Sequence, residues 1–167
     1  MNGGADSGAR GGRAGGAGSA GGADPAGGGE STAFESVLTR EECVALLGGQ
    51  AHGRLVLTTP AGRPLIRPVN YVYDTRSGSV VFRTGRGTKF SALLRDAWSC
   101  FEIDAFEPTT GCGWSVIVTG ITEPVTHAPD VARLDTLPLA PLASRRPHWF
   151  RLRARTVTGR RIEPVAG

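Results

Sequence analysis

The chain has 167 residues, a formal net charge of +4 and a pI near 9.5, and 40% of its residues are hydrophobic. This length suits one domain with a core of its own. The basic balance is compatible with an anionic cofactor or a nucleic acid as partner. No apolar run is long enough to span a bilayer, which argues against a membrane-spanning protein.

The cysteines and histidines point to neither a disulfide framework nor a metal site. The three cysteines, Cys43, Cys100 and Cys112, form no CxxC pair, and any disulfide would leave one of them over. This usage suits the reducing cytoplasm, where we place the protein. The histidines are scattered, and none has another histidine or a cysteine three or four residues away, so no metal is expected.

The first part of the chain is expected to be a disordered tail, residues 1–33. From Met1 to Glu30 the sequence is nearly all Gly and Ala and lacks aromatic residues, Leu, Ile and Val. Such a segment cannot bury enough apolar surface to offset the entropy of ordering. It has neither the apolar region of a secretory signal nor the pattern of a transit peptide. The folded domain is expected at residues 34–162, followed by a short C-terminal tail, 163–167.

The domain is predicted to open with a short helix and a β-hairpin. In "LTREECVALL", Thr39 and Glu42 have the spacing of a capping box. The segments at 54–59 and 65–74 are typical of strands, and "PAGRP" between them is typical of a turn. Pro68 cannot donate to a β-ladder, so the second strand should have a free edge or a bulge there.

The remaining elements are mostly strands. The patterns predict strands at 80–84, 98–106, 113–125 and 148–159, and helices at about 88–94 and within 128–137. In the last strand three apolar residues alternate with three arginines, Arg151, Arg153 and Arg155. Six hairpin-linked strands with small helices favour a mainly β, antiparallel barrel or sandwich over a doubly wound dinucleotide fold.

The segment "VVFRTGRGTKFSALL" is the first candidate site, because a strand there runs through a turn into a helix. A helix N-terminus offers free N–H groups to an anion. The turn adds hydroxyl groups and positive charge, and its two glycines allow close approach; the donors are Arg83, Thr84, Thr88 and Lys89. The alternative is an ordinary capped turn with solvated basic residues. The spacing of a P-loop is absent, which argues against a nucleotide triphosphatase.

Three other features are weaker candidate sites, and each also has a purely structural explanation. Asn70 in "RPVNY" is disfavoured by β-propensity and could have a functional reason, or it could lie on solvated surface. Trp114 in "GWSVIVTG" could be a site residue, but packing in the core or at a dimer interface is the commoner role of a lone Trp. The row Arg151–Arg155 could follow a nucleic-acid backbone, but a solvated basic face is the commoner case, and no aromatic RNA-binding motif accompanies it.

Taken together, these segments resemble a known family. "GRLVLTTPAGRPLIRPVNYVYD", "VVFRTGRGTKFSALL", "FEIDAFEPTTGCGWSVIVTG" and "TVTGRRI" are similar to pyridoxamine 5′-phosphate oxidase-like proteins with an FMN-binding split barrel. They look most like the branch of small flavoproteins that is also related to nitroimidazole reductases. The resemblance extends from roughly residue 38 to residue 162, almost the whole folded part.

The resemblance implies a six-stranded antiparallel Greek-key split barrel, a homodimer, and FMN in a groove at the dimer interface. It implies that Arg67, Pro68, Val69 and Asn70 contact the flavin ring and ribityl chain. The turn residues Arg83, Thr84, Thr88 and Lys89 would hold the phosphate. Trp114 and Ser115 would approach the flavin from a neighbouring strand or from the partner.

The expected activity is that of an FMN-dependent oxidoreductase. Hydride would pass through flavin N5 between a reduced nicotinamide or other donor and an unidentified small substrate, and no catalytic side chain is assigned. The substrate-binding arginine and histidine motif of true pyridoxamine phosphate oxidases has no counterpart in "RLRARTVTGRRI", which argues against vitamin B6 oxidation. The alternatives are a non-catalytic module for flavin, deazaflavin or haem, and a basic nucleic-acid-binding dimer, the last ranked well behind.

Overall fold

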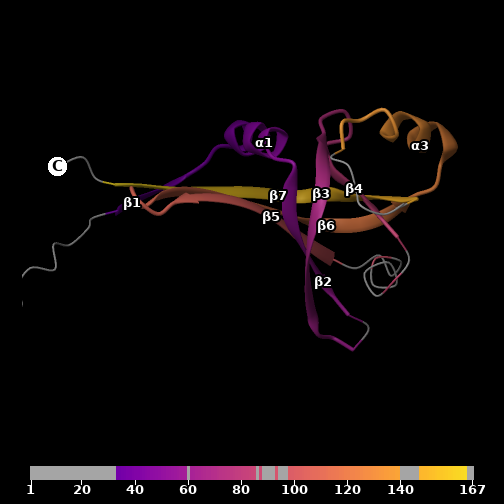
Figure 1. The fold of residues 1–167 in the computed structure, drawn as a ribbon, viewed down its shortest axis with the longest axis horizontal. Helices are drawn as coiled ribbons and strands as arrows, with labels where there is room; N and C mark the ends of the chain where they lie inside the picture. The colour runs from indigo at the N-terminus through magenta and orange to yellow at the C-terminus, as the bar shows by residue number, and fades with distance from the viewer. Residues whose placement is uncertain are drawn as a thin grey trace, which may run out of the picture. The chain divides into compact units, whose positions relative to one another are not determined.

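The computed structural model describes residues 33–59, 61–85, 87, 93, 98–139 and 147–164. Their elements, in chain order, are β1 (Ala33–Val37), α1 (Arg40–Gly49), β2 (His52–Thr58), β3 (Pro64–Asp74), β4 (Ser79–Thr84), β5 (Trp98–Glu107), β6 (Cys112–Val125), α3 (Ala128–Leu134) and β7 (His148–Pro164) (Figure 1). Every predicted strand is present within a few residues of its expected bounds. The helix predicted at about 88–94 lies outside the described residues, apart from Leu93.

Six of the strands close a barrel. β2, β3 and β4 form one meander and β5, β6 and β7 a second one, with every pairing antiparallel. β5 returns to pair with β2, and β7 pairs with β4, so the spatial order β5–β2–β3–β4 is a Greek key. The predicted six-stranded antiparallel split barrel is therefore confirmed. No local pattern predicts β1, which pairs with the C-terminal end of β7 as a seventh strand.

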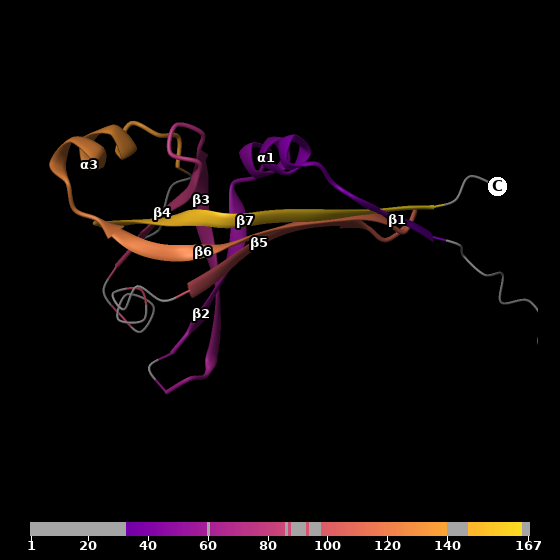
Figure 2. The ribbon, with the colours of Figure 1, turned by 180° about the vertical axis from the view of Figure 1, so that it is seen from behind.

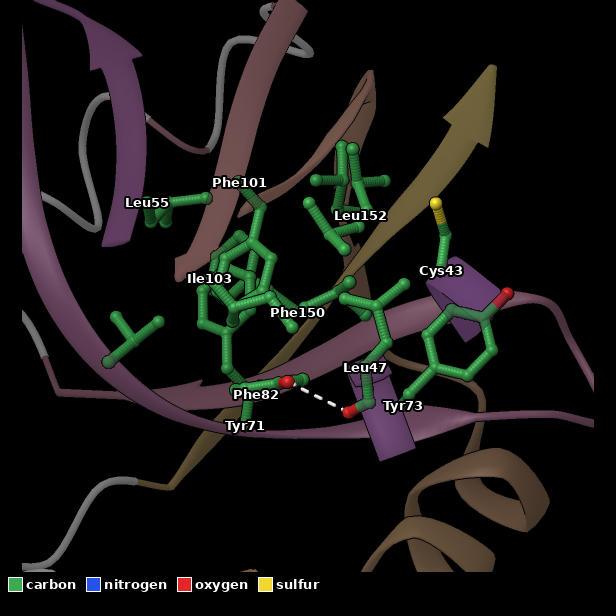
Figure 3. Close-up of a cluster of buried hydrophobic side chains, with 14 of the residues drawn as sticks. Cys43, Leu47, Leu55, Tyr71, Tyr73, Phe82, Phe101, Ile103, Phe150 and Leu152 are labelled. Carbon is green, nitrogen blue, oxygen red and sulfur yellow. Dashed lines mark hydrogen bonds between the residues drawn. The ribbon is translucent and has the colours of Figure 1, made fainter. Parts of the chain in front are cut away.

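The core fills the inside of the barrel. Inward-facing side chains of the strands meet α1 there, and Tyr71 donates a hydrogen bond from its hydroxyl to the carbonyl oxygen of Leu47, at 2.8 Å (Figure 3). The ring of Tyr71 also meets Phe101 edge to face, with 4.6 Å between centroids. Each such aromatic or aliphatic side chain contributes roughly 1.5–3 kcal/mol through its burial. The fully enclosed members include Leu47, Leu55, Phe82, Phe101, Ile103, Phe150 and Leu152.

Helix α1 begins with the predicted capping box. The backbone N–H of Thr39 donates to Glu42 Oε2 at 2.8 Å, and the N–H of Glu42 donates to Thr39 Oγ1 at 3.2 Å. Cys43 and Leu47 are fully buried on the barrel side of the helix. The local sequence thus fixes where the helix starts, and its apolar side fixes which way it faces.

Helix α3 packs on the outside of the barrel over a second, smaller apolar cluster. That cluster contains Val81, Val125, Leu134 and Trp149, with Val72 beside it. Both views show α3 above the end of β6 from which the chain leads into it (Figures 1 and 2). Away from the helices, the outward side chains of β2, β3, β5 and β6 are exposed or half-buried.

We call this exposed outer surface the open face. Side chains alternate along each strand, and the open face consists of those that point away from the core. They are residues 66, 68 and 70 on β3, 52, 54 and 56 on β2, 100, 102 and 104 on β5, and 115, 117 and 119 on β6. Ile66 is 57% exposed and Ile117 is 40% exposed. A face with apolar residues left in water is suited to covering by another molecule.

Candidate functional site

The strands β3 and β4 bring two of the predicted site residues together. Their ladder includes the pair Tyr71 and Phe82, so Asn70 and Arg83 are the next residue on each strand. Because Tyr71 and Phe82 point into the core, Asn70 and Arg83 share the outer surface. An amide and a guanidinium group are therefore neighbours beside the open face.

Arg83 is held in place by the end of α3. Its guanidinium lies over the ring of Trp149, 5.0 Å from the centroid, and its Nη1 lies 3.5 Å from Asp135 Oδ1. The indole N–H of Trp149 donates to the same carboxylate oxygen at 2.8 Å. An arginine fixed in this way loses less conformational freedom when it binds an anion.

The turn after β4 is only partly described. Thr84 is buried, and its hydroxyl donates to the carbonyl oxygen of Gly85 at 3.1 Å. Gly87 has φ +148°, a conformation that side chains disfavour, so a glycine is needed there. Thr88 and Lys89, the other two predicted phosphate ligands, lie outside the described residues, and their role stays a prediction.

The segment from Arg67 to Asn70 presents main chain as well as side chains. Arg67 and Pro68 are exposed, Val69 is buried and Asn70 is half-buried. Arg67 donates from Nη1 to the carbonyl oxygen of Ile66 at 3.0 Å. In the described ladders this segment pairs with β2, whereas β4 joins β3 only from Tyr71 onward, so Pro68 has no β4 partner among the described residues, which agrees with the predicted free edge or bulge.

Trp114 and Ser115 line a cavity of about 210 Å³ on β6. The indole of Trp114 is half-buried against the core cluster, whereas Ser115 belongs to the open face. Asn70 pairs with His52, and continuing the β2–β5 register places His52 opposite Asp104, which pairs with Ser115. Asn70 and Ser115 therefore lie in one row, three strand spacings or about 14 Å apart.

Between Asn70 and Ser115 lies a cluster of three charged side chains that no sequence motif indicated. Arg54 of β2 hydrogen-bonds Asp104 and lies 3.7 Å from Glu102, both on β5. The alternation in each strand shows that these side chains face outward. Only the pairing of two segments almost fifty residues apart makes them neighbours, and no local pattern reports that.

Metal-binding and membrane-spanning features are absent from the described part of the chain. It contains no group of three or more His, Cys, Asp or Glu side chains that could hold a metal ion. Among the same residues, no helix is long and apolar enough to cross a membrane. The three cysteines carry free thiols.

The closed antiparallel barrel places the chain in the class of split-barrel proteins. The family model for pyridoxamine 5′-phosphate oxidase matches residues 39–161, and the chain belongs to that family. This confirms the resemblance seen in the sequence motifs.

Three relatives illustrate the match. A solved structure of an FAD binding protein from Mycobacterium smegmatis is 36% identical, covers 77% of this chain and 98% of its own, and superposes with a TM-score of 0.65. A conserved protein from Corynebacterium diphtheriae is 29% identical over 78% of this chain and 98% of its own, with a TM-score of 0.64. An uncharacterized protein of Mycobacterium tuberculosis is 37% identical over 105 residues, which is 60% of this chain and 67% of that one.

Proposed function

We propose that the protein binds FMN on the open face and acts as a flavin-dependent oxidoreductase on a small substrate. The observation that carries the proposal is the juxtaposition of Asn70 and Arg83 beside Pro68, whose stretch of β3 has no β4 partner among the described residues. Family membership and the 36% identity to an FAD binding protein support a flavin as the ligand.

The donors present fit a flavin mononucleotide. The main chain of Arg67–Val69 has no β4 partner within the described ladders and could meet the polar edge of the ring, and Asn70 offers both a donor and an acceptor. Arg83 offers a guanidinium that matches a phosphate, and Thr88 and Lys89 are assigned to the same group by sequence. Ser115, about 14 Å from Asn70 along one row, would meet the far end of the ligand.

When bound, the flavin supplies hydride transfer through its N5 atom. The chain's part is to hold and shield it: Asn70 would orient the polar edge of the ring, and Trp114 beside the cavity on β6 would limit access of water. Donors near the N1–C2=O edge favour the negatively charged reduced form. Asn70 on the open face, or the exposed guanidinium of Arg67, would supply such a donor. A reduced nicotinamide is the proposed electron donor.

We also propose that two copies of the chain pair through the open face. Ile66 and Ile117 leave apolar surface in water there, and a second copy would cover it together with one side of the flavin. A homodimer of this kind would enclose two flavins, one from each open face.

The test is titration of the purified chain with FMN and with FAD, followed by flavin fluorescence and absorbance. We expect saturable binding with FMN preferred, and oxidation of reduced nicotinamide by the loaded protein. Lys89→Ala should weaken binding by about 1.5–3 kcal/mol, the range of a charge-assisted hydrogen bond, with the fold intact. Arg40→Ala, an exposed arginine at the start of α1, is the matched control.

Two results would contradict the proposal. Full FMN affinity in the Lys89→Ala protein would remove the assigned phosphate site. Absence of any spectral response to FMN or FAD would remove the flavin altogether. Flavin binding without turnover of any nicotinamide would instead favour the non-catalytic flavin-binding module.

A further inference from the structure

The basic row of β7 ends at an irregularity in the sheet. β6 and β7 pair regularly from Gly113 to Thr119, then slip, so that Thr119 faces Thr156 while Gly120 faces Ala154. Arg155 is the residue left over. The slip is a β-bulge, a device that turns a side chain away from the direction that simple alternation would give it.

The close approach of the two strands at this point requires a glycine. A Cβ atom on Gly120 would lie 2.9 Å from the carbonyl carbon of Arg153 and closer still to its oxygen. With the bulge in place, Ala154 and Val157 both pack against the core, while Arg155 is exposed on the outside beside Arg153. Arg155 thus keeps the outward direction of Arg153, and the bulge changes the alternation after it, because Val157 rather than Thr156 packs against the core.

The same place is hollow. A cavity of about 390 Å³ opens there, which is within the size range of small-molecule sites. Ile121 and Ala154 supply apolar surface, and the turn residues Ser77 and Gly78 line the cavity from the β3–β4 connection. The remaining lining residues are Glu123, Arg153 and Arg155.

The charges around the cavity do not cancel. Arg151 and Arg153 each donate from Nε to the same oxygen of Glu123, at 2.6 and 2.7 Å, and Arg151 also lies 3.8 Å from Asp130. Three guanidinium groups against two carboxylates leave one positive charge. The ion pair engages Arg153 through its Nε, and within the described residues its two terminal nitrogens make no hydrogen bond. Arg155 has no ion-pair partner among the described residues.

We propose that this cavity binds a small organic anion, with a carboxylate or phosphate held by Arg153 and Arg155 and an apolar body against Ile121 and Ala154. Arginine presents a planar fork that suits either oxyanion. The ion pairs with Glu123 interrupt the basic row, so a recess for one anion fits better than a stripe along a nucleic-acid backbone. This replaces the two interpretations considered for the arginine row in the sequence.

The site is separate from the proposed flavin groove. Arg153 pairs with Ser79, and Trp149, which lies under Arg83, pairs four residues further along β4, or about 13 Å away. The inference therefore does not rest on flavin binding. It is tested on the full chain both without flavin and with saturating FMN, so that failure of one proposal leaves the other standing.

The experiment is calorimetric titration with benzoate, phenyl phosphate and neutral benzamide, at two salt concentrations. Benzoate or phenyl phosphate should bind saturably, with the preferred head group decided by their ratio, and benzamide should not. Arg153→Ala and Arg155→Ala should each weaken binding at least about tenfold, the effect of losing one charge-assisted hydrogen bond, while Arg40→Ala should not. Amide resonances of Ile121 and Ala154 should shift during the same titration.

Three outcomes would overturn the site. One is equal affinity of the two arginine variants and the Arg40→Ala control. Another is binding that matches inorganic phosphate and vanishes in physiological salt, which would indicate nonspecific attraction. The third is tight binding of a single-stranded oligonucleotide that Arg151→Ala, Arg153→Ala and Arg155→Ala weaken alike, because this would restore the nucleic-acid interpretation.

Discussion

Arg83, at the end of β4, lies 3.5 Å from Asp135, the residue that ends α3. The contact joins the candidate phosphate site to the helix on the outside of the barrel. Arg83→Gln should lower FMN affinity about tenfold or more, since a hydrogen bond to a charged group is worth roughly 1.5–3 kcal/mol. Fluorescence titration measures this loss.

A companion variant separates binding from anchoring. Asp135→Asn keeps an acceptor for the indole of Trp149 but removes the negative charge beside Arg83. If Arg83 binds the phosphate, its charge is then less compensated, and FMN affinity should hold or rise. An equal loss of affinity in both variants would show that Arg83 acts only by positioning α3.

The ion pair of Asp74 and Arg133 predicts a dependence of stability on pH. Arg133 donates from both terminal nitrogens to Asp74, at 3.0 and 2.7 Å, and Ser77 adds a third hydrogen bond to this buried carboxylate. Burial alone would raise the pKa of Asp74, but the bonds from Arg133 and Ser77 outweigh it and lower the pKa below the ordinary value.

The lowered pKa of Asp74 determines how the stability of the fold changes with pH. A carboxyl group with a lowered pKa in the folded state stabilises the fold above its unfolded pKa of about 3.9, and the contribution is lost as pH falls through the folded value. Arg133→Gln should therefore cost about 2–3 kcal/mol at pH 7 and less in acid. Urea unfolding at pH 7 and near pH 3 checks this; an equal cost at both values would contradict it.

The tyrosine hydroxyls of β3 offer a matched pair. Tyr71 donates to the carbonyl oxygen of Leu47 at 2.8 Å, and burial raises the pKa of this phenol. Tyr71→Phe should cost about 1 kcal/mol, because a carbonyl in the last turn of α1 loses its donor. Tyr73 is also buried but donates no side-chain bond within the described residues, so Tyr73→Phe should be nearly neutral. Thermal unfolding of both proteins compares them.

The features of the fold that can be predicted from the sequence are those encoded within one short segment. The capping box of Thr39 and Glu42 and the inward row of β7 are local features that the structure confirms. Pro68 is local as well, and its stretch of β3 has no β4 partner within the described ladders. The strand β1 escapes prediction because its five residues gain their partner only from the far end of the chain.

The candidate site also combines features encoded in one segment with features that depend on distant strands. Its basic turn is visible in "FRTGRGTK", since one segment contains all the donors. The pairing of Arg54 with Asp104, and the shared row of Asn70 and Ser115, come from ladders between distant strands. The bulge at Arg155 cannot be predicted for another reason. The alternation of residues predicts that the arginines share one face, but not the shift in the β6–β7 register.

Gly120 provides a test of that bulge. Because a Cβ atom there would collide with the carbonyl group of Arg153, Gly120→Ala should destabilise the protein by about 1–3 kcal/mol or more, the range for overpacking. A Cβ atom on Gly49, at the end of α1, would meet no atom within 4 Å apart from its chain neighbours and the backbone of its own helix, so Gly49→Ala should be neutral or slightly stabilising. Chemical denaturation would compare the two, and equal stabilities would mean that the strands relax at the bulge.

The proposed dimer makes the last prediction. If the open face is covered by a second copy, a charge at Ile117 would be buried without a partner, and Ile117→Asp should leave a chain of 17.4 kDa where the unaltered protein should measure twice that mass. Ala61→Asp, in the exposed turn between β2 and β3, is the control and should stay dimeric. Light scattering after size exclusion reports the mass. Flavin affinity should fall with the dimer, because the second copy covers one side of the ring; a monomeric variant that keeps full affinity would show that a single open face suffices.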